Sequence, residues 1–224
     1  MQHSDKQKRL RIFFTGVGGQ GTLTATTLLA RTALDAGQEV VAGEVHGMAQ
    51  RGGVVESVLL LGGWRSPKLD LGEADILLGF EPLETLRGLP YLRPGGVIFS
   101  SRDPMPPLSV SLGMAAYPSM EEIEQKSRAV ASQCHFLACR ELGIQAGAAQ
   151  AGNTVLLAAV CASGLLPFGI DALKAAIEKY LPAKLQASNL KALELGQAAL
   201  PMYQQHGRVV LLRGGPPHLR CRCP

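Results

Sequence analysis

The stretch RLRIFFTGVGGQGTLTATTLLARTAL, residues 9–34, decides the fold. Its first residues are apolar and predict a strand, its glycines predict a turn, and the residues after them predict a helix. The glycines are Gly16, Gly18, Gly19 and Gly21. Such a turn exposes backbone N–H groups at a helix N-terminus, so it can hold an anion or let another backbone come close. The spacing of Gly16, Gly18 and Gly21 also fits the pattern G-x-G-x-x-G, which taken alone would indicate a dinucleotide site.

The residues after the second predicted strand argue against a plain dinucleotide site. Such a site has an acidic residue about twenty positions after the glycines, at the end of the second strand. Glu39 begins that strand and Glu44 ends it, so the requirement is half met. The run VHGMAQRGGVVES, residues 45–57, then sets His46, Gln50 and Arg51 among three glycines. So many hydrogen-bond donors indicate a binding loop, and the alternative is a tight Gly-rich turn.

Strands and helices alternate in the first half of the chain, and helices dominate the second half. Strands are predicted at 11–15, 39–43, 54–61, 76–80 and 97–100. Helices are predicted at 22–36, 82–89, 120–142, 151–163, 170–179 and 183–200. This order predicts an α/β protein, a three-layer α/β/α fold with a mostly parallel, Rossmann-like sheet and C-terminal helices. We expect one domain at 9–200, with flexible tails at 1–8 and 201–224.

Composition limits the classes of partner. Of the 224 residues, 46% are apolar and 18% charged, which favours a well-buried monomer or a chain partly covered by another subunit. A net charge of +4 without a dense basic stripe does not indicate nucleic-acid binding. The five cysteines form no CxxC pair and the N-terminus has no apolar signal segment, so we expect a cytoplasmic protein with reduced thiols and no metal site.

One uncharged stretch, residues 143–170, raises the question of a membrane span. Gln145, Gln150, Asn153, Gly164 and Pro167 interrupt it, and its continuous apolar part is too short to cross a bilayer. A helix that is apolar on all sides is usually buried, either in the fold or in a subunit interface. We therefore expect a buried helix at 155–160, no membrane association, and a dimer or a large interface with another chain.

Several blocks of sequence resemble one enzyme family. They are GVGGQGTLTATTLLA (16–30), EVHGMAQRGG (44–53), EADILLGFEPLETLRGLPYLRPGGVIFSS (73–101), AGNTVLLAAV (151–160) and LPAKLQASNLKALELG (181–196). Together they resemble the gamma-type subunit or domain of the 2-oxoacid:ferredoxin oxidoreductases, most closely the small (beta) subunit of the indolepyruvate enzymes. The resemblance covers about residues 9–200. Its specific block is EVHGMAQRGG, whereas the glycine motif alone is weak.

The resemblance implies an accessory subunit that binds no cofactor firmly and is inactive alone. Thiamine diphosphate, Mg²⁺ and 4Fe–4S clusters are then expected in a large catalytic partner subunit, in keeping with the lack of a GDG…N pattern and of a ferredoxin-type cysteine run here. Such a complex converts a 2-oxoacid, here an arylpyruvate such as indolepyruvate, with coenzyme A and oxidised ferredoxin into acyl-CoA, CO2 and reduced ferredoxin. A dimer of heterodimers is one arrangement that it implies.

Two other classes of function stay open at this point. One is a free-standing NAD(P)- or FAD-binding oxidoreductase, and the other is a nucleotide-binding regulatory module without enzyme activity. The loop at 45–53 distinguishes the first from the leading interpretation, because a plain Rossmann protein does not need it.

Each candidate residue has a functional and a structural interpretation. The four glycines could offer N–H groups to a phosphate of coenzyme A or allow close subunit contact. Arg51 could pair with a phosphate or carboxylate through its bidentate guanidinium, and Glu44 could orient Arg51 or His46. His46 could handle a proton or be a structural hydrogen bonder, and the whole loop could instead dock the large subunit. Asn153 could hydrogen-bond across to the Gly-rich loop, but we favour a cap on its own helix.

Overall fold

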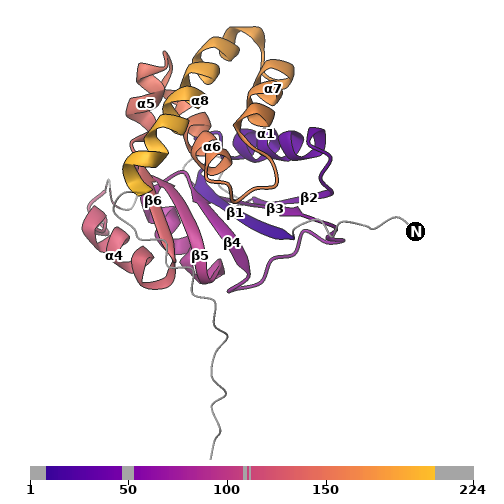
Figure 1. Cartoon of the computed structure of the whole chain (residues 1–224). Coiled ribbons are helices and arrows are strands. Elements are labelled where there is room, and N and C mark those ends of the chain that lie inside the picture. The colour runs from indigo at the N-terminus through magenta and orange to yellow at the C-terminus, as the bar shows by residue number, and fades with distance from the viewer. Residues whose placement is uncertain (1–8, 47–52, 108–109, 111, 205–224) are drawn as a thin grey trace, which may run out of the picture.

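A six-stranded sheet lies between two layers of helices in the computed structural model, which describes residues 9–46, 53–107, 110 and 112–204 (Figure 1). Its strands are β1 (Leu10–Val17), β2 (Val40–His46), β3 (Val54–Leu61), β4 (Ala74–Gly79), β5 (Leu92–Ser101) and β6 (Gln133–Leu137). The helices are α1 (Thr22–Asp35), α2 (Pro82–Gly88), α4 (Met120–Val130), α5 (Cys139–Gln145), α6 (Gly152–Ala162), α7 (Ile170–Tyr180) and α8 (Ala183–Gln204). Two short 3-10 segments, Leu89–Tyr91 and Ala149–Ala151, precede β5 and α6.

The strand order is β2-β3-β1-β4-β5-β6. The pairs β1/β4, β4/β5 and β5/β6 are parallel, whereas β3 runs antiparallel to both β1 and β2. Only seven residues, 47–53, separate β2 from β3, and a connection this short joins antiparallel strands, since a parallel pair needs a crossover of a dozen residues or more. The α/β class and the mostly parallel sheet are therefore confirmed, with one antiparallel strand inserted beside β1.

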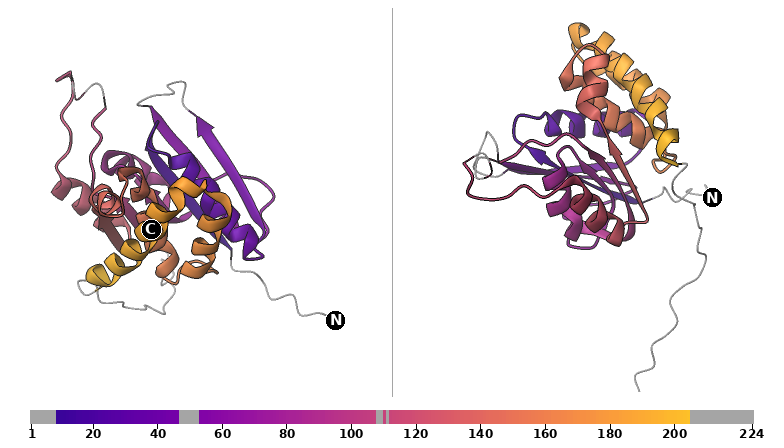
Figure 2. Two further views of the ribbon diagram at one scale, coloured as in Figure 1. Left: turned by 90° about the horizontal axis from the view of Figure 1, so that it is seen from above. Right: turned by 90° about the vertical axis from the view of Figure 1, so that its left-hand side faces the viewer.

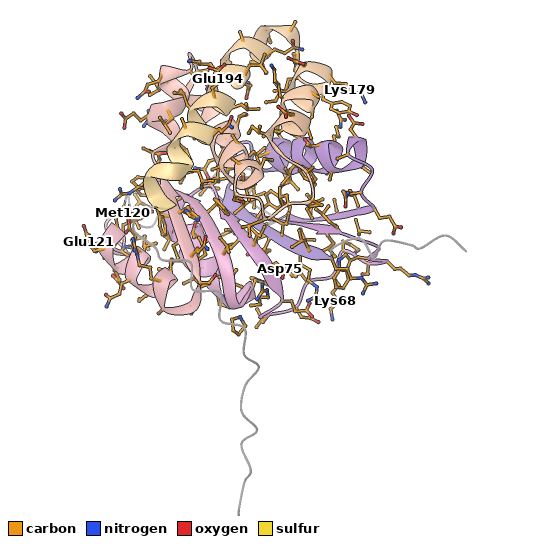
Figure 3. All side chains as sticks on the ribbon, in the orientation of Figure 1. Lys68, Asp75, Met120, Glu121, Lys179 and Glu194 are labelled. Carbon is orange, nitrogen blue, oxygen red and sulfur yellow. The ribbon has the colours of Figure 1, made fainter. Side chains whose placement is uncertain are left out.

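Helices cover both faces of the sheet (Figures 1 and 2). Successive residues of a strand point to opposite faces, so Ile12 and Phe14 enter the core under α1 and α6, while Phe13 points to the side of α2. The larger core lies beneath α1 and the C-terminal helices. Side chains fill the space between the layers, and charged residues such as Lys68, Lys179 and Glu194 lie at the periphery (Figure 3). The three-layer prediction is confirmed.

The single helix predicted at 120–142 is wrong, because this segment forms α4, then β6, then α5. Ser119 caps α4, its Oγ accepting from the N–H of Glu122 at 3.1 Å. The chain becomes extended at Ala131, and β6 then pairs with the edge of β5, with His135 opposite Phe99. Pairing with a distant strand overrides the local helix preference, since it satisfies the backbone and buries the strand.

The buried helix predicted at 155–160 is confirmed. All six residues lie in α6 and are at most 1% exposed, packed in the main core. The chain's own sheet and helices cover α6, so the uncharged stretch is no argument for a dimer or another interface. No helix in the part of the chain that the structure describes is long and apolar enough to cross a membrane.

Most other boundaries agree with the prediction to within a few residues. β2 starts at Val40 and continues to His46, so Glu39 precedes the strand and Glu44 lies inside it. α8 ends at Gln204, four residues beyond the predicted end. Of the two segments expected to be flexible tails, 1–8 and 201–224, residues 201–204 instead belong to α8. Residues 1–8 and 205–224 lie outside the described residues.

Candidate functional site

The glycine turn, residues 16–21, joins β1 to α1 through a backbone that requires glycine. Gly19 and Gly21 have φ angles of +97° and +82°, which side-chain-bearing residues rarely adopt. A Cβ on Gly16 would lie 2.6 Å from the Oγ1 of Thr22, so no side chain fits there. The turn predicted from the glycine spacing therefore requires glycine at three positions, Gly16, Gly19 and Gly21.

Some backbone N–H groups of the turn donate hydrogen bonds within the protein, and others have no partner among the described residues. Gly18 donates to the carbonyl of Gly53 at 2.8 Å, which joins the turn to the end of the 45–53 loop. Within the described residues, the N–H groups of Gly19 and Gly21 have no hydrogen-bond partner. Gly21 is the N-cap of α1, which has no side-chain cap and no acidic residue in its first turn. The positive end of a 14-residue helix is thus open to an anion.

Asn153 fixes the outer side of this turn. Its Nδ2 donates to the carbonyl of Gln20 at 2.7 Å, across 133 positions of sequence. The N-cap of α6 is Ala151 and no side chain caps that helix, so the favoured capping role for Asn153 is wrong. The bond that it makes instead reaches the glycine turn and not the 45–53 loop. Asn153 therefore ties the start of α6 to the turn.

Gln20 links the turn to the neighbouring strand. Its Oε1 accepts from the N–H of Val17 at 2.8 Å, and its Nε2 donates to the carbonyl of Phe80 at 3.4 Å. Phe80 directly follows β4, and its own N–H donates to the carbonyl of Thr15 at 2.8 Å. The carboxyl ends of β1 and β4 are thus joined by both backbone and side-chain hydrogen bonds.

A cavity of about 370 Å³ opens at this edge of the sheet. After β1 the chain enters α1 on one face, and after β4 it enters α2 on the other face. Open α/β sheets bind ligands at this kind of switch point, where neighbouring connections leave in opposite directions. The lining comes from five segments: Gly19 and Gln20; Phe80; Ser101, Asp103, Pro104 and Met105; Cys139 and Arg140; and Ala149, Gln150, Gly152, Asn153 and Leu156.

The cavity holds one carboxylate and one guanidinium with different tasks. Asp103 accepts hydrogen bonds from the Oγ of Ser101 and from the backbone N–H of Arg140, each at 2.7 Å. Its charge is therefore used to fix the wall of the cavity. The guanidinium of Arg140 makes no hydrogen bond or ion pair with any described residue. Together with the open end of α1, Arg140 makes the cavity suitable for an anion.

Arg140 was not found from the sequence. The predicted helix at 120–142 placed it on a helix interior, whereas it follows β6 at the carboxyl edge of the sheet. The apolar run FLAC, residues 136–139, lies directly before it and was the available signal for a strand. A basic residue immediately after a predicted parallel strand is a candidate ligand-binding residue.

The cysteine in the cavity wall, Cys139, is not activated as a nucleophile. Burial raises the pKa of the Cys139 thiol, and the nearby Asp103 carboxylate raises it further. The thiol therefore stays protonated at neutral pH, and a protonated thiol is a poor nucleophile. Among the residues that the structure describes, no group of three or more His, Cys, Asp or Glu side chains is arranged to hold a metal ion.

The structure brings only part of the predicted set together. Gly19 and Asn153 line the cavity, and Gly16, Gly18 and Gly21 shape the turn beside it. Glu44 lies in β2 opposite Ser57, away from the cavity lining. His46 ends β2, and its side chain is not among those described. Gln50 and Arg51 lie outside the described residues.

The sequence of this domain matches a known family over most of its length. Residues 11–199 match the family described as "Pyruvate ferredoxin/flavodoxin oxidoreductase". The chain belongs to this family. The resemblance inferred from the glycine turn, the EVHGMAQRGG block and the later blocks is therefore confirmed.

Curated members of the family are similar along nearly the whole domain. The indolepyruvate oxidoreductase subunit IorB of Pyrococcus horikoshii is 42% identical over 200 residues, which is 86% of this chain and 96% of that protein. The protein of the same name from Archaeoglobus fulgidus is 40% identical over 189 residues, covering 84% of this chain and 94% of that one. This domain therefore corresponds to almost the entire length of these relatives.

Solved structures share the fold at lower identity. The gamma subunit of a keto/oxoacid ferredoxin oxidoreductase from Geobacter sulfurreducens superposes with a TM-score of 0.62 at 22% identity, covering 86% of this chain and 99% of that one. A 2-oxoglutarate:ferredoxin oxidoreductase from Magnetococcus marinus, solved with 2-oxoglutarate, coenzyme A and succinyl-CoA, gives a TM-score of 0.65 at 17% identity. The match covers 88% of this chain but 32% of that longer one. The same domain thus occurs as a separate chain and within a longer chain.

Proposed function

We propose that this chain is the small, accessory subunit of a 2-oxoacid:ferredoxin oxidoreductase that acts on an arylpyruvate such as indolepyruvate. The complex would oxidatively decarboxylate the 2-oxoacid and yield acyl-CoA, CO2 and reduced ferredoxin. In this proposal the large partner subunit holds thiamine diphosphate, Mg²⁺ and the 4Fe–4S clusters, and the small subunit is inactive alone. The observation that carries the proposal is the 42% identity to an indolepyruvate oxidoreductase subunit over almost its full length.

We propose further that the cavity receives a phosphate group of coenzyme A. Coenzyme A supplies the thiol that takes up the acyl group, and its phosphates are anions that need N–H donors and positive charge. The open N–H groups of Gly19 and Gly21, the end of α1 and the guanidinium of Arg140 supply both. The residues present therefore fit a phosphate, and their task is to bind and orient the co-substrate.

The first test is reconstitution. The chain should bind the purified large subunit, and the complex should reduce ferredoxin when indolepyruvate and coenzyme A are both present. The small subunit alone should show no such activity. A chain that fails to associate with the large subunit, or that turns over substrate without it, would contradict the proposal.

The second test concerns Arg140 in the complex. A charged hydrogen bond contributes about 1.5–3 kcal/mol, and the exposed position of Arg140 favours the lower figure, so Arg140→Ala should raise the KM for coenzyme A about tenfold. Arg128→Ala is the matched control, since Arg128 is an exposed arginine on α4 that pairs with Glu124 at 3.0 Å. If the Arg140→Ala complex had an unchanged KM for coenzyme A, the proposal that the cavity binds coenzyme A would be refuted.

Arg51 in the 45–53 loop stays a proposal from the sequence. We propose that its guanidinium pairs with a phosphate or carboxylate, or docks the large subunit together with Glu44 and His46. Arg51→Ala should then leave the subunit folded but lower turnover or weaken assembly. A bidentate role predicts that Arg51→Lys fails as well, whereas simple charge attraction predicts partial rescue. Normal assembly and turnover of the Arg51→Ala complex would refute this role.

The alternative of a free-standing NAD(P)- or FAD-binding oxidoreductase rests on the glycine spacing alone. It predicts tight binding of the dinucleotide to the isolated chain. The accessory-subunit proposal predicts weak binding or none. Calorimetry with NADH separates the two, and a low-micromolar dissociation constant would revive the alternative.

A further inference from the structure

The segment between β5 and α4 is an unusual piece of surface. From Pro104 to Ser119 the sequence PMPPLSVSLGMAAYPS contains no charged residue. Leu112 and Met114 are 63% and 77% exposed, among the most exposed large apolar residues of the described chain. In Figure 2 the described parts of this segment, which leave out residues 108, 109 and 111, extend away from the sheet and its helices. Solvent-exposed apolar residues grouped on one projecting segment mark an interaction site.

A buried carboxylate holds the base of this segment. Glu81 is fully buried, and its Oε1 accepts from the N–H of Met105 at 3.1 Å and from the hydroxyl of Tyr117. Its Oε2 accepts from the N–H of Glu84 at 2.9 Å, which caps α2. Met105 and Tyr117 lie near the two ends of the segment, so one carboxylate closes its base. A loop whose ends are fixed in this way loses less conformational freedom when its tip binds a partner.

The segment projects from the same edge of the sheet as the cavity. It follows the carboxyl end of β5, and its first residues, Pro104 and Met105, line the cavity. By contrast Leu71, which is 66% exposed, lies in the connection from β3 to β4 at the opposite edge. A chain that covers the cavity would therefore contact the first residues of this segment as well.

We propose that the described residues 112–117 of this segment dock the large, thiamine-bearing subunit, with Leu112 and Met114 entering an apolar groove of that subunit beside the cavity. The inference rests on the proposed function. The large subunit is the occupant, in preference to a second copy of this chain, because the segment forms part of the cavity wall where the large subunit would complete the site. Depletion of charge and the presence of methionine are typical of the buried centre of an interface.

The test uses the full chain and the purified large subunit. The double variant Leu112→Asp, Met114→Asp should bind the large subunit at least about tenfold more weakly in sedimentation or calorimetric titration, since a few central residues carry most of the binding energy. Leu71→Asp is the matched control and should bind like the native chain. Both variants should melt like the native chain, because all three residues are exposed. The double variant Leu112→Ser, Met114→Ser should also weaken binding, since the proposed contact is apolar.

The possible results have distinct meanings. Native affinity in the Leu112 and Met114 variants, or an equal loss in Leu71→Asp, would overturn the docking role while the proposed function stands. A loss confined to the aspartate variant would show charge repulsion and not an apolar contact, which also overturns it. The native chain could also be a dimer on its own. If the double variant were monomeric and still bound the large subunit normally, the segment would serve self-association and the docking role would be wrong. If the native chain does not bind the large subunit, both proposals fail.

Discussion

Asn153→Ala tests the link between α6 and the glycine turn most directly. The native amide donates one hydrogen bond of 2.7 Å to the carbonyl of Gln20. A neutral hydrogen bond contributes about 0.5–1.5 kcal/mol net, and a buried carbonyl left without a partner costs about 1–3 kcal/mol. Both Asn153 and Gln20 line the cavity, so water can reach the vacated carbonyl. We therefore expect a loss of about 1 kcal/mol in the free energy of unfolding.

The Asn153→Ala variant should loosen the glycine turn more than it lowers the stability of the whole fold. In urea, a loss of about 1 kcal/mol moves the unfolding midpoint by roughly 0.4 M for a protein of this size. Hydrogen exchange of the amides in the glycine turn should accelerate, because the turn loses the hydrogen bond between the Asn153 side chain and the carbonyl of Gln20 that ties it to α6. In the complex, the KM for coenzyme A should rise while turnover at saturation changes little.

Asn189→Ala is the matched control. Asn189 accepts a hydrogen bond from Thr154, the next residue of α6, and donates to the carbonyl of Leu185 at 2.7 Å. Its loss should have a similar global cost and leave exchange in the glycine turn unchanged. If the Asn153 and Asn189 variants affected the turn and the KM for coenzyme A equally, the bond to Gln20 would not be what positions the turn.

Three further predictions concern packing, a buried hydrogen bond and a buried histidine. Leu156→Ala should cost about 2–3 kcal/mol in urea unfolding and Leu157→Ala about 3–5 kcal/mol, because Leu156 borders the cavity and the space it vacates joins an opening that already exists; equal costs would contradict this. Tyr117→Phe should cost about 1.5–3 kcal/mol, since its hydroxyl donates to a buried carboxylate, whereas Tyr180→Phe removes an exposed bond to a carboxylate and should cost under about 1 kcal/mol. Burial lowers the pKa of His135 below its usual 6.5, so the unfolded chain binds a proton at a pH where the folded chain does not. The stability of the native chain relative to His135→Phe should therefore fall as the pH drops below about 6.5, and a difference that does not vary with pH would refute this.

Local signals in the sequence were sufficient for the first half of the fold. The apolar run before the glycines, Gly37 after α1 and Pro82 at the start of α2 each act within a few residues of the element they define. The glycine turn was also readable, because positive φ angles restrict Gly19 and Gly21 to glycine whatever their tertiary contacts.

The elements that were missed depend on partners far away in the sequence. β6 exists because its backbone pairs with β5, and the segment before it contains no glycine or proline to end a helix. The antiparallel direction of β3 had a usable signal, since two strands joined by a Gly-rich loop without a helix predict a hairpin. The alternation of strands and helices in the rest of the first half favours a parallel sheet, which is why a mostly parallel sheet was predicted without this hairpin.

The candidate site was predicted only in part, because some of its residues also depend on partners far away in the sequence. Gly19 belongs to a local motif and was found, and Asn153 was found with the wrong partner. Asp103 and Arg140 enter the site through the order of strands in the sheet, which no local pattern specifies. Residues of this kind are recognised only after the carboxyl ends of the strands have been placed side by side.

The antiparallel strand β3 separates phosphate binding from recognition of a ribose. In dinucleotide-binding folds, the strand next to β1 ends in an acidic residue that holds the ribose hydroxyls. Here β3 occupies that place, and β2, which carries Glu44, lies two strand spacings from β1, about 10 Å, instead of about 5 Å. In the binding mode that we propose, the glycine turn still offers N–H groups to a phosphate, whereas the carboxylate of Glu44, which would select a nucleoside, lies one strand farther from β1. On this proposal, one inserted strand leaves a site that accepts phosphate groups without selecting a nucleoside, and the partner subunit would supply the specificity.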